Sequence, residues 1–308
     1  MPTWLLIAVL AISTVGQAPT ARPEWDDPAV LHVGTEKPHA TLMVYPSAEL
    51  ALAGDRTQSP WFRSLNGSWK FNYAPGPSQR PVDFYREDFR DDKWGTIRVP
   101  GSIEMQGHGI PIYVNIGYAF PYDQQNPRPP REKNPVGSYR TTFEVPADWS
   151  GRRVYLHFGG VDSAFYAWVN GVRIGYSEDS RTPAEFDVTP HVRPGRNLLA
   201  VEVYRFSDGS FLEDQDMFRL SGIFRDVFLW TAADQHVRDF EVSSDLDAKY
   251  LNGTLGVRAL VANHAKGAAA ATLAVELRDA DGVRVATQTR RLRATAGVDT
   301  PVVISLPV

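Results

Sequence analysis

The strongest local fold signal in this sequence is the stretch AFYAWVNGVRIGY, residues 164–176. Two runs rich in aromatic and β-branched residues flank Asn170-Gly171, and this dipeptide is a preferred two-residue turn between antiparallel strands. The stretch therefore predicts a β-hairpin.

Further strands are expected on both sides of this hairpin. Polar residues alternate with aromatic or aliphatic ones in residues 68–73, 139–145 and 153–158, and residues 198–204 are another expected strand, which follows the Pro194-Gly195 turn. No stretch of ten or more residues combines a 3.6-residue apolar period with helix caps. Many short strands without helices are typical of a β-sandwich or jelly roll, so the predicted fold class is all-β.

A change in composition divides the chain. Aromatic residues are dense from Pro60 to Trp230, whereas residues 236–308 contain only Phe240 and Tyr250. We therefore predict a jelly-roll domain over residues 59–232 and a second β-sandwich over residues 235–308. An immunoglobulin-like sandwich has about seven strands, so the second domain is expected to be incomplete. Its five candidate strands are residues 237–242, 254–262, 272–278, 283–289 and 302–306.

The N-terminus has the pattern of an export signal. An uninterrupted apolar run, Trp4 to Ile12, is followed by small residues. A membrane-spanning helix needs about 20 apolar residues, so residues 1–21 are predicted to be a signal peptide and the protein to be periplasmic or secreted. A buried or disordered extension is the alternative. The proline-containing residues 22–58 are predicted to be an extended segment.

Composition excludes several function classes. The chain has 308 residues, a formal net charge of −4 and no cysteine. A general basic surface for nucleic acid is excluded, as are disulfides, zinc fingers and a cysteine nucleophile. No membrane span is expected. Phosphate-loop, dinucleotide-binding, zinc-protease and serine-hydrolase motifs are absent. The seven histidines are scattered, which favours surface or core roles over a metal site.

One acidic cluster stands out. Four carboxylates, Asp208, Glu213, Asp214 and Asp216, fall within SDGSFLEDQDMFR, residues 207–219. Clustered carboxylates raise one another's pKa unless cations or donors compensate; Arg219, Arg225, a hard cation or sugar hydroxyls would do so, and a solvated acidic loop is the alternative. Glycoside hydrolysis needs two carboxyl groups facing each other across a substrate, so a binding or structural role is favoured here.

A second cluster is MQGHGIPIYVNIGYAF, residues 105–120, which is rich in glycine and aromatic residues. The amide of Asn115 offers both a donor and an acceptor, which suits vicinal hydroxyls. Tyr and Phe rings offer faces for sugar rings. A loop packed inside the sandwich is the alternative interpretation.

Together these segments resemble glycoside hydrolase family 2. The resemblance rests on SLNGSWKF (64–71), PIYVN (111–115), GVDSAF (160–165) and GYSEDSRTPAEFD (175–187). In addition, DGSFLEDQDMFRLSGIFRDV (208–227) is similar to the signature of the family's large β-galactosidases. The resemblance implies a sugar-binding jelly roll, then an immunoglobulin-like domain, then a catalytic TIM barrel.

The resemblance also implies an activity, the retaining hydrolysis of terminal β-D-galactosides. The two catalytic glutamates of the family belong to the barrel, which is expected to be absent from this chain. No catalytic residue is therefore assigned here, and the chain alone is expected to be inactive. The family enzymes use Na⁺ and Mg²⁺ and are oligomeric, so a homo-oligomer is expected for a full-length protein.

The site residues implied by the resemblance are few. Asn115 would contact the galactose, and Asp216 would contact galactose hydroxyls and a Na⁺. Val114 and Ile116 are neighbours that would shape the rim. Because the other Na⁺ ligands would lie in the barrel, the metal site is expected to be incomplete and neither metal to bind tightly to this chain alone. The sequence departs from the family at Gly101-Ser102-Ile103 and at Gly117 and Ala119, which affects the expected rim geometry.

Three functions fit these observations. The first is the N-terminal part of an exported β-galactosidase, in which Glu213 and Asp214 hold the acidic loop and Asp216 is the ligand. The second is a stand-alone carbohydrate-binding module. The third is an assembly segment that complements a separately encoded barrel.

Overall fold

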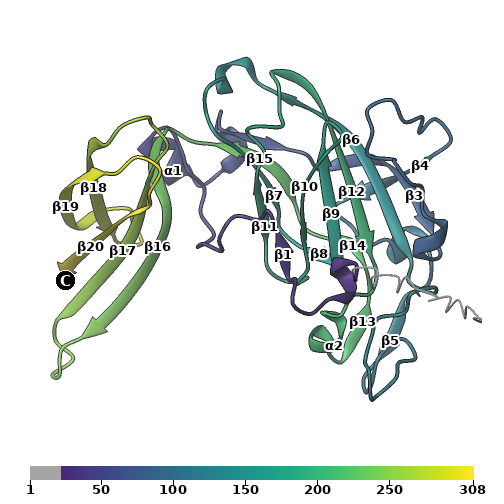
Figure 1. Ribbon diagram of the computed structural model, residues 1–308. Coiled ribbons are helices and arrows are strands. Elements are labelled where there is room, and N and C mark those ends of the chain that lie inside the picture. The colour runs from purple at the N-terminus through teal and green to yellow at the C-terminus, as the bar shows by residue number, and fades with distance from the viewer. Residues whose placement is uncertain (1–21) are drawn as a thin grey trace, which may run out of the picture.

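The computed structural model describes residues 22–308, which form a larger and a smaller β-rich part (Figure 1). The last strand of the larger part ends at Thr231, and the first strand of the smaller part begins at Gln235. The predicted signal peptide, residues 1–21, lies outside the described residues. Within residues 22–308, no helix is long and apolar enough to cross a membrane.

The larger part is a sandwich of two antiparallel sheets. Their strand orders are β1-β10-β9-β12-β6-β3-β4 and β11-β7-β15-β2. The bounds are β1 His32–Val33, β2 Phe62–Ser64, β3 Gly67–Ala74, β4 Gly95–Val99, β6 Val136–Val145, β7 Val154–Phe158, β9 Ala164–Val169, β10 Val172–Ser177, β11 Ala184–Asp187, β12 Gly195–Tyr204 and β15 Val227–Thr231. The predicted all-β sandwich is confirmed, and the described residues contain no barrel.

Two short ribbons accompany the sandwich. In one, β5 (Ile112–Val114) pairs with β13 (Met217–Arg219), and in the other, β8 (Val161–Asp162) pairs with β14 (Gly222–Ile223). The first ribbon lies at one end of the larger part, beside the short helix α2 (Ser210–Glu213) (Figure 1). This ribbon combines the two clusters that the sequence singled out.

The predicted hairpin is formed by β9 and β10. Asn170 and Gly171 at its turn have φ values of 50° and 84°, the positive values that a two-residue hairpin turn requires. The Asn170 side chain accepts a hydrogen bond from the Leu198 amide and donates one to the Asn197 side chain, both at 2.8 Å. These bonds fix the turn against the adjacent strand β12.

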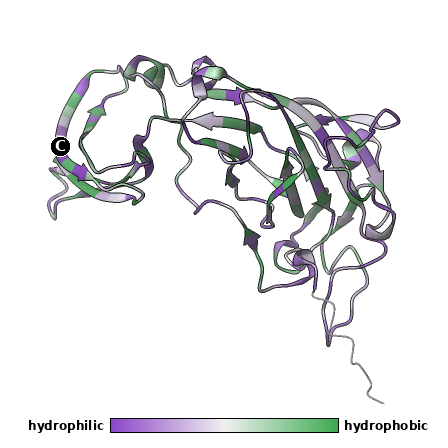
Figure 2. Cartoon of the chain, turned by 45° about the horizontal axis from the view of Figure 1, so that its top comes forward, coloured by the Kyte–Doolittle hydropathy of each residue, from purple (hydrophilic) through white to green (hydrophobic). Residues whose placement is uncertain are grey.

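Aromatic side chains fill the interior of the sandwich. Six of them, from both sheets, are at most 3% exposed: Trp69, Phe71, Tyr139, Phe158, Phe165 and Phe186. Figure 2 shows long hydrophobic stretches on the strands of this part. Because burying one such side chain contributes about 1.5–3 kcal/mol, this core makes the larger part a rigid support for the ribbon.

The predicted extended segment, residues 22–58, is largely irregular but closely packed. Its strand β1 pairs with β10 and forms the edge of the larger sheet. A Cβ on Gly175 would lie 2.1 Å from the Val33 carbonyl oxygen, so only glycine allows this approach. The segment also contains a short helix, α1 (Ala48–Ala53), capped by Ser47 and ended by Gly54 at φ 71°. The sequence predicted neither α1 nor α2, because helices of six and four residues are too short for a 3.6-residue period to repeat over ten residues.

The smaller part contains five strands, the number expected from the sequence. A three-stranded sheet contains β16 (Gln235–Leu246), β17 (Gly253–Asn263) and β20 (Thr300–Pro307), and β18 (Ala269–Arg278) pairs with β19 (Arg284–Ala294). Its core cluster is small and aliphatic, with Val261, Ala294 and Val302 at its centre. The immunoglobulin-like assignment stays a prediction.

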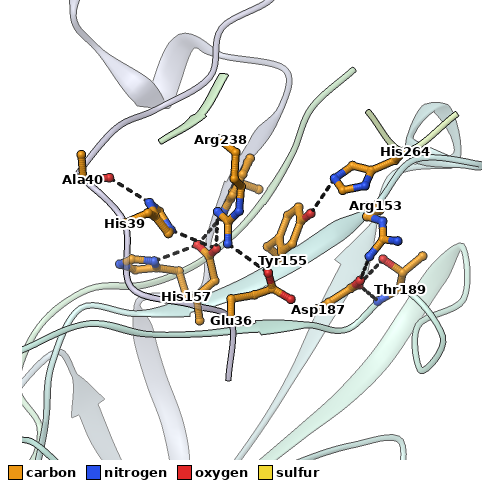
Figure 3. Close-up of polar contacts among 12 residues, drawn as sticks. Glu36, His39, Ala40, Arg153, Tyr155, His157, Asp187, Thr189, Arg238 and His264 are labelled. Atoms are coloured by element: carbon orange, nitrogen blue, oxygen red, sulfur yellow. Dashed lines mark hydrogen bonds and ion pairs between the residues drawn. The ribbon is translucent and has the colours of Figure 1, made fainter. Parts of the chain in front are cut away.

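A buried carboxylate, Glu185 on β11, joins the parts. It accepts hydrogen bonds from Trp230 at 2.7 Å and from His157 at 3.2 Å, both in the same sheet. It also contacts His39 of the N-terminal segment at 3.2 Å and Arg238 of β16 at 2.9 Å. Figure 3 shows His39, His157 and Arg238 converging from three segments. We call these five residues the Glu185 hub.

Candidate functional site

The two segments that the sequence singled out meet in the β5–β13 ribbon. Val114 pairs with Met217, and Tyr113 pairs with Phe218. Continuing this antiparallel register by one residue places Asn115 opposite Asp216. The fold therefore brings together the two residues for which sequence analysis predicted galactose contacts, although they come from distant parts of the chain.

One face of the ribbon combines polar and aromatic groups. Tyr113 and Phe218 are cross-strand partners on one face, and the Tyr113 hydroxyl donates to Asp216. With Asn115, the residue that follows β5, we call these four residues the ribbon face. The Tyr113 and Phe218 rings are 55% and 56% exposed and lie edge to face at 5.5 Å. An amide, a carboxylate and aromatic rings are the groups that suit a sugar.

The opposite side of the ribbon is held by Arg219. Its guanidinium donates to the Val114 carbonyl at 3.0 Å and the Met217 carbonyl at 2.9 Å. It also forms an ion pair with Asp214. Arg219 therefore ties both strands to the acidic loop and fixes the ribbon face from behind.

The two predicted rim residues lie differently. Val114 is half-buried and gives its carbonyl to Arg219, whereas Ile116 follows β5 and is 86% exposed. Their role at a rim stays a prediction.

The carboxylates of the acidic loop divide by their partners. Glu213 accepts hydrogen bonds from the Ser180 amide at 2.5 Å and the Ser180 hydroxyl at 2.7 Å. Asp214 is paired with Arg219, whereas Arg225 donates to the carbonyls of Gly159 and Arg181. Burial raises the pKa of both Glu213 and Asp214. Asp216 is exposed, so it is the carboxylate available to a ligand.

A small cavity lies behind the ribbon, lined partly by Asp162, Arg181 and Arg205. Its volume is about 40 Å³, room for a few waters but far below the ~300 Å³ of typical ligand pockets. Burial raises the pKa of Asp162 to about 7, against the opposing charge of Arg181. A sugar would therefore have to lie on the exposed ribbon face.

Asp216, the predicted Na⁺ ligand, has one side-chain partner among the described residues. Asp216 accepts a hydrogen bond from the Tyr113 hydroxyl. Among residues 22–308, no group of three His, Cys, Asp or Glu side chains is arranged to hold a metal ion. The role of Asp216 as a Na⁺ ligand stays a prediction.

A second pair of carboxylates, Glu178 and Asp208, has oxygens without a hydrogen-bond partner. One oxygen of each, Glu178 Oε1 and Asp208 Oδ1, is buried without a hydrogen-bond partner. The other Glu178 oxygen accepts from the Tyr176 hydroxyl at 2.8 Å. Burial raises the pKa of Glu178 to about 8 and that of Asp208 to about 6. Carboxylate oxygens without a hydrogen-bond partner are ligands that Mg²⁺ can bind.

Sequence analysis missed this pairing for a topological reason. Glu178 follows β10, and Asp208 lies shortly after β12. Both strands are neighbours of β9 and antiparallel to it. They are therefore parallel to each other, and their carboxyl ends lie at the same end of the sheet. Only the strand order shows this.

The comparisons with known proteins define the family. The model described as "Glycosyl hydrolases family 2, sugar binding domain" matches residues 62–233, more than half of the chain. The chain therefore belongs to glycosyl hydrolase family 2.

Curated relatives cover most of the chain. It is 45% identical over 245 residues to a β-galactosidase of Priestia megaterium, which covers 79% of this chain and 24% of that protein. It is 39% identical over 295 residues to a β-galactosidase large subunit of Leuconostoc lactis, which covers 91% of this chain and 46% of that protein. The chain thus spans between a quarter and a half of the length of these relatives.

Solved structures confirm the fold. A Bacteroides uniformis β-glucuronidase superposes with a TM-score of 0.65 at 21% identity, covering 80% of this chain and 28% of that one. A β-galactosidase-like protein from Bacteroides fragilis superposes with a TM-score of 0.61 at 18% identity, covering 80% and 35%.

Proposed function

We propose that this chain is the N-terminal part of a retaining β-galactosidase and that its ribbon face contributes to the galactose pocket. The observation that carries the proposal is the pairing of β5 with β13 at one end of a rigid sandwich, because Asn115 directly follows β5 and Asp216 directly precedes β13. The relatives at 39% and 45% identity support the substrate class.

In this proposal the chain binds and orients the sugar and performs no bond cleavage. Asn115 donates to and accepts from neighbouring hydroxyls, and Asp216 accepts hydrogen bonds from galactose hydroxyls. A retaining mechanism needs an acid/base and a nucleophilic carboxylate about 5–5.5 Å apart; these come from the barrel of a complete family enzyme. Positioning of this kind lowers the barrier by fixing the reacting sugar.

Two cations belong to the proposal. Asp216 would supply one Na⁺ ligand, and the buried Glu178 with the half-buried Asp208 would contribute ligands to Mg²⁺. Export of the protein and homo-oligomerisation of the full-length enzyme are also proposed, from the apolar N-terminal run and from the family.

The test is a chimera in which the full chain replaces the matched N-terminal segment of the Priestia megaterium relative. Hydrolysis of o-nitrophenyl β-D-galactoside by the chimera, with none by this chain alone, supports the proposal. A folded chimera that binds no galactoside contradicts it, and so does hydrolysis by the chain alone.

A second function is favoured by one observation, the Leuconostoc lactis relative, which is described as a large subunit. The chain would then assemble with a separately encoded catalytic chain. Affinity purification from the source cells distinguishes the two, because only assembly predicts a second galactoside-hydrolysing polypeptide in stoichiometric amount.

A further inference from the structure

The Tyr113 hydroxyl is the one side-chain group within residues 22–308 that donates a hydrogen bond to Asp216. Tyr113 is on β5 and Asp216 immediately precedes β13. We propose that Tyr113 is a positioning residue that holds the Asp216 carboxylate toward the sugar. This inference rests on the proposed function.

Tyr113 is itself held in place by the ribbon. It is the cross-strand partner of Phe218, and the two rings meet edge to face at 63°. Arg219, the next residue, fastens both strands through the carbonyls of Val114 and Met217. The phenol hydroxyl is therefore presented from a fixed backbone by a ring with a packed neighbour.

Asp216 needs such a partner because little else restrains it. It is exposed, in contrast to Glu213 and Asp214, whose oxygens are held by Ser180 and Arg219. The Tyr113 hydroxyl donates to Oδ1 of Asp216, which leaves Oδ2 for a sugar hydroxyl or a cation. Fixing one oxygen in advance reduces the side-chain entropy that Asp216 loses when a ligand binds.

The hydrogen bond also affects Tyr113. Because the phenol donates to a carboxylate, its pKa is raised above the ordinary value, against the opposing charge of Arg219.

The test compares Tyr113→Phe with Tyr250→Phe in the chimera. Tyr250 is an exposed tyrosine of the smaller part, so its variant controls for loss of a surface phenol. Tyr113→Phe keeps the ring and its contact with Phe218. We expect KM for o-nitrophenyl β-D-galactoside to rise about fivefold to tenfold, the NaCl concentration for half-maximal activity to rise, and the control to match the parent.

A second measurement uses the full chain alone. Because Tyr113→Phe keeps the ring, the melting temperature of the full chain should stay within about 1 °C of the parent value, and a larger loss would show a structural role and overturn the positioning role. An active chimera whose KM and NaCl dependence are insensitive to Tyr113→Phe overturns this role and leaves the proposed function standing. An inactive parent chimera contradicts both.

Discussion

Glu185 and Asp216 are carboxylates of one domain with opposite surroundings. Glu185 is 5% exposed and is held by four side chains, those of His39, His157, Trp230 and Arg238. Asp216 is exposed and has one donor, the Tyr113 hydroxyl. A carboxylate saturated with partners cannot accept from a ligand without losing bonds, whereas Asp216 keeps an oxygen for one. The comparison separates a residue that holds the protein together from a residue that is available for binding.

The largest expected effect is on stability, from Glu185→Gln. The substitution removes the charge that Arg238 faces in a buried site, and breaking a buried ion pair costs about 3–5 kcal/mol. We expect a loss of about 3 kcal/mol in the free energy of unfolding of the full chain, measured by urea denaturation. A loss below ~1 kcal/mol would mean that the Glu185 hub does not join the parts.

The next effect is on binding, from Asp216→Asn in the chimera. Hydrogen bonds to a charged group contribute about 1.5–3 kcal/mol, so KM for the galactoside should rise about tenfold to a hundredfold. Because Asp216 is exposed, the melting temperature should stay within about 1 °C of the parent value. An equal loss of stability and affinity would remove the distinction between the two carboxylates.

A third prediction concerns Glu178, which is buried, and the half-buried Asp208, each of which has one oxygen without a hydrogen-bond partner. MgCl₂ should raise the melting temperature of the full chain, and EDTA should reverse this, because a cation that binds only the folded state stabilises it. Asp208→Asn should abolish the increase, whereas Asp216→Asn should retain it. If MgCl₂ does not affect the parent chain, the magnesium site is contradicted.

A fourth prediction is a pH dependence at the Glu185 hub. Both ring nitrogens of His39 face acceptor oxygens, the Ala40 carbonyl at 2.8 Å and the Glu185 carboxylate at 3.2 Å. Only the protonated ring can donate a hydrogen bond to both. Burial would lower the pKa of His39, but the hydrogen bond and charge of Glu185 outweigh burial and the repulsion of Arg238 and raise it above 6.5.

The sign follows from that shift. Because the folded-state pKa is raised, the stabilisation by His39 is fully present below its ordinary pKa and is lost as pH rises through the raised value. The difference in unfolding free energy between the parent and His39→Gln should therefore be larger near pH 6 than near pH 8. The opposite trend would show that His39 is neutral in the hub.

The smallest effect is expected at the exposed pair Arg193–Glu87, with side chains 55% and 49% exposed. Exposed ion pairs contribute about 0–1 kcal/mol, so Glu87→Gln should change the unfolding free energy by less than ~1 kcal/mol. It is the matched control for Glu185→Gln, and a comparable loss at both sites would show that burial is not what distinguishes them.

The sequence predicted the parts of this fold that local patterns determine. The Asn170-Gly171 turn and the alternating strands were predictable because side-chain period and turn chemistry are local properties. The convergence of His39, Glu185 and Arg238 was not, because it depends on how three separate segments pack. The short helix α1 was missed because its capping by Ser47 and Gly54 spans too few residues to produce a period.

The same reasoning applies to the candidate site. Asn115 and Asp216 were found through a family resemblance, and the register of β5 and β13 then brought them together. The hydrogen bond from Tyr113 to Asp216 depends on the register that pairs Tyr113 with Phe218 across the ribbon. The pairing of Glu178 with Asp208 depends on the order of the strands in the sheet. Neither is encoded in the spacing of residues along the chain.

The central claim is that this chain belongs to a larger galactoside hydrolase, and its most direct test is the mass of the native gene product. An immunoblot of the source cells with an antibody against residues 60–230 measures that mass. The account predicts a polypeptide far larger than 34.3 kDa, in the same fraction as galactoside-hydrolysing activity. A product at or slightly below that mass, with no hydrolytic partner attached, would contradict it.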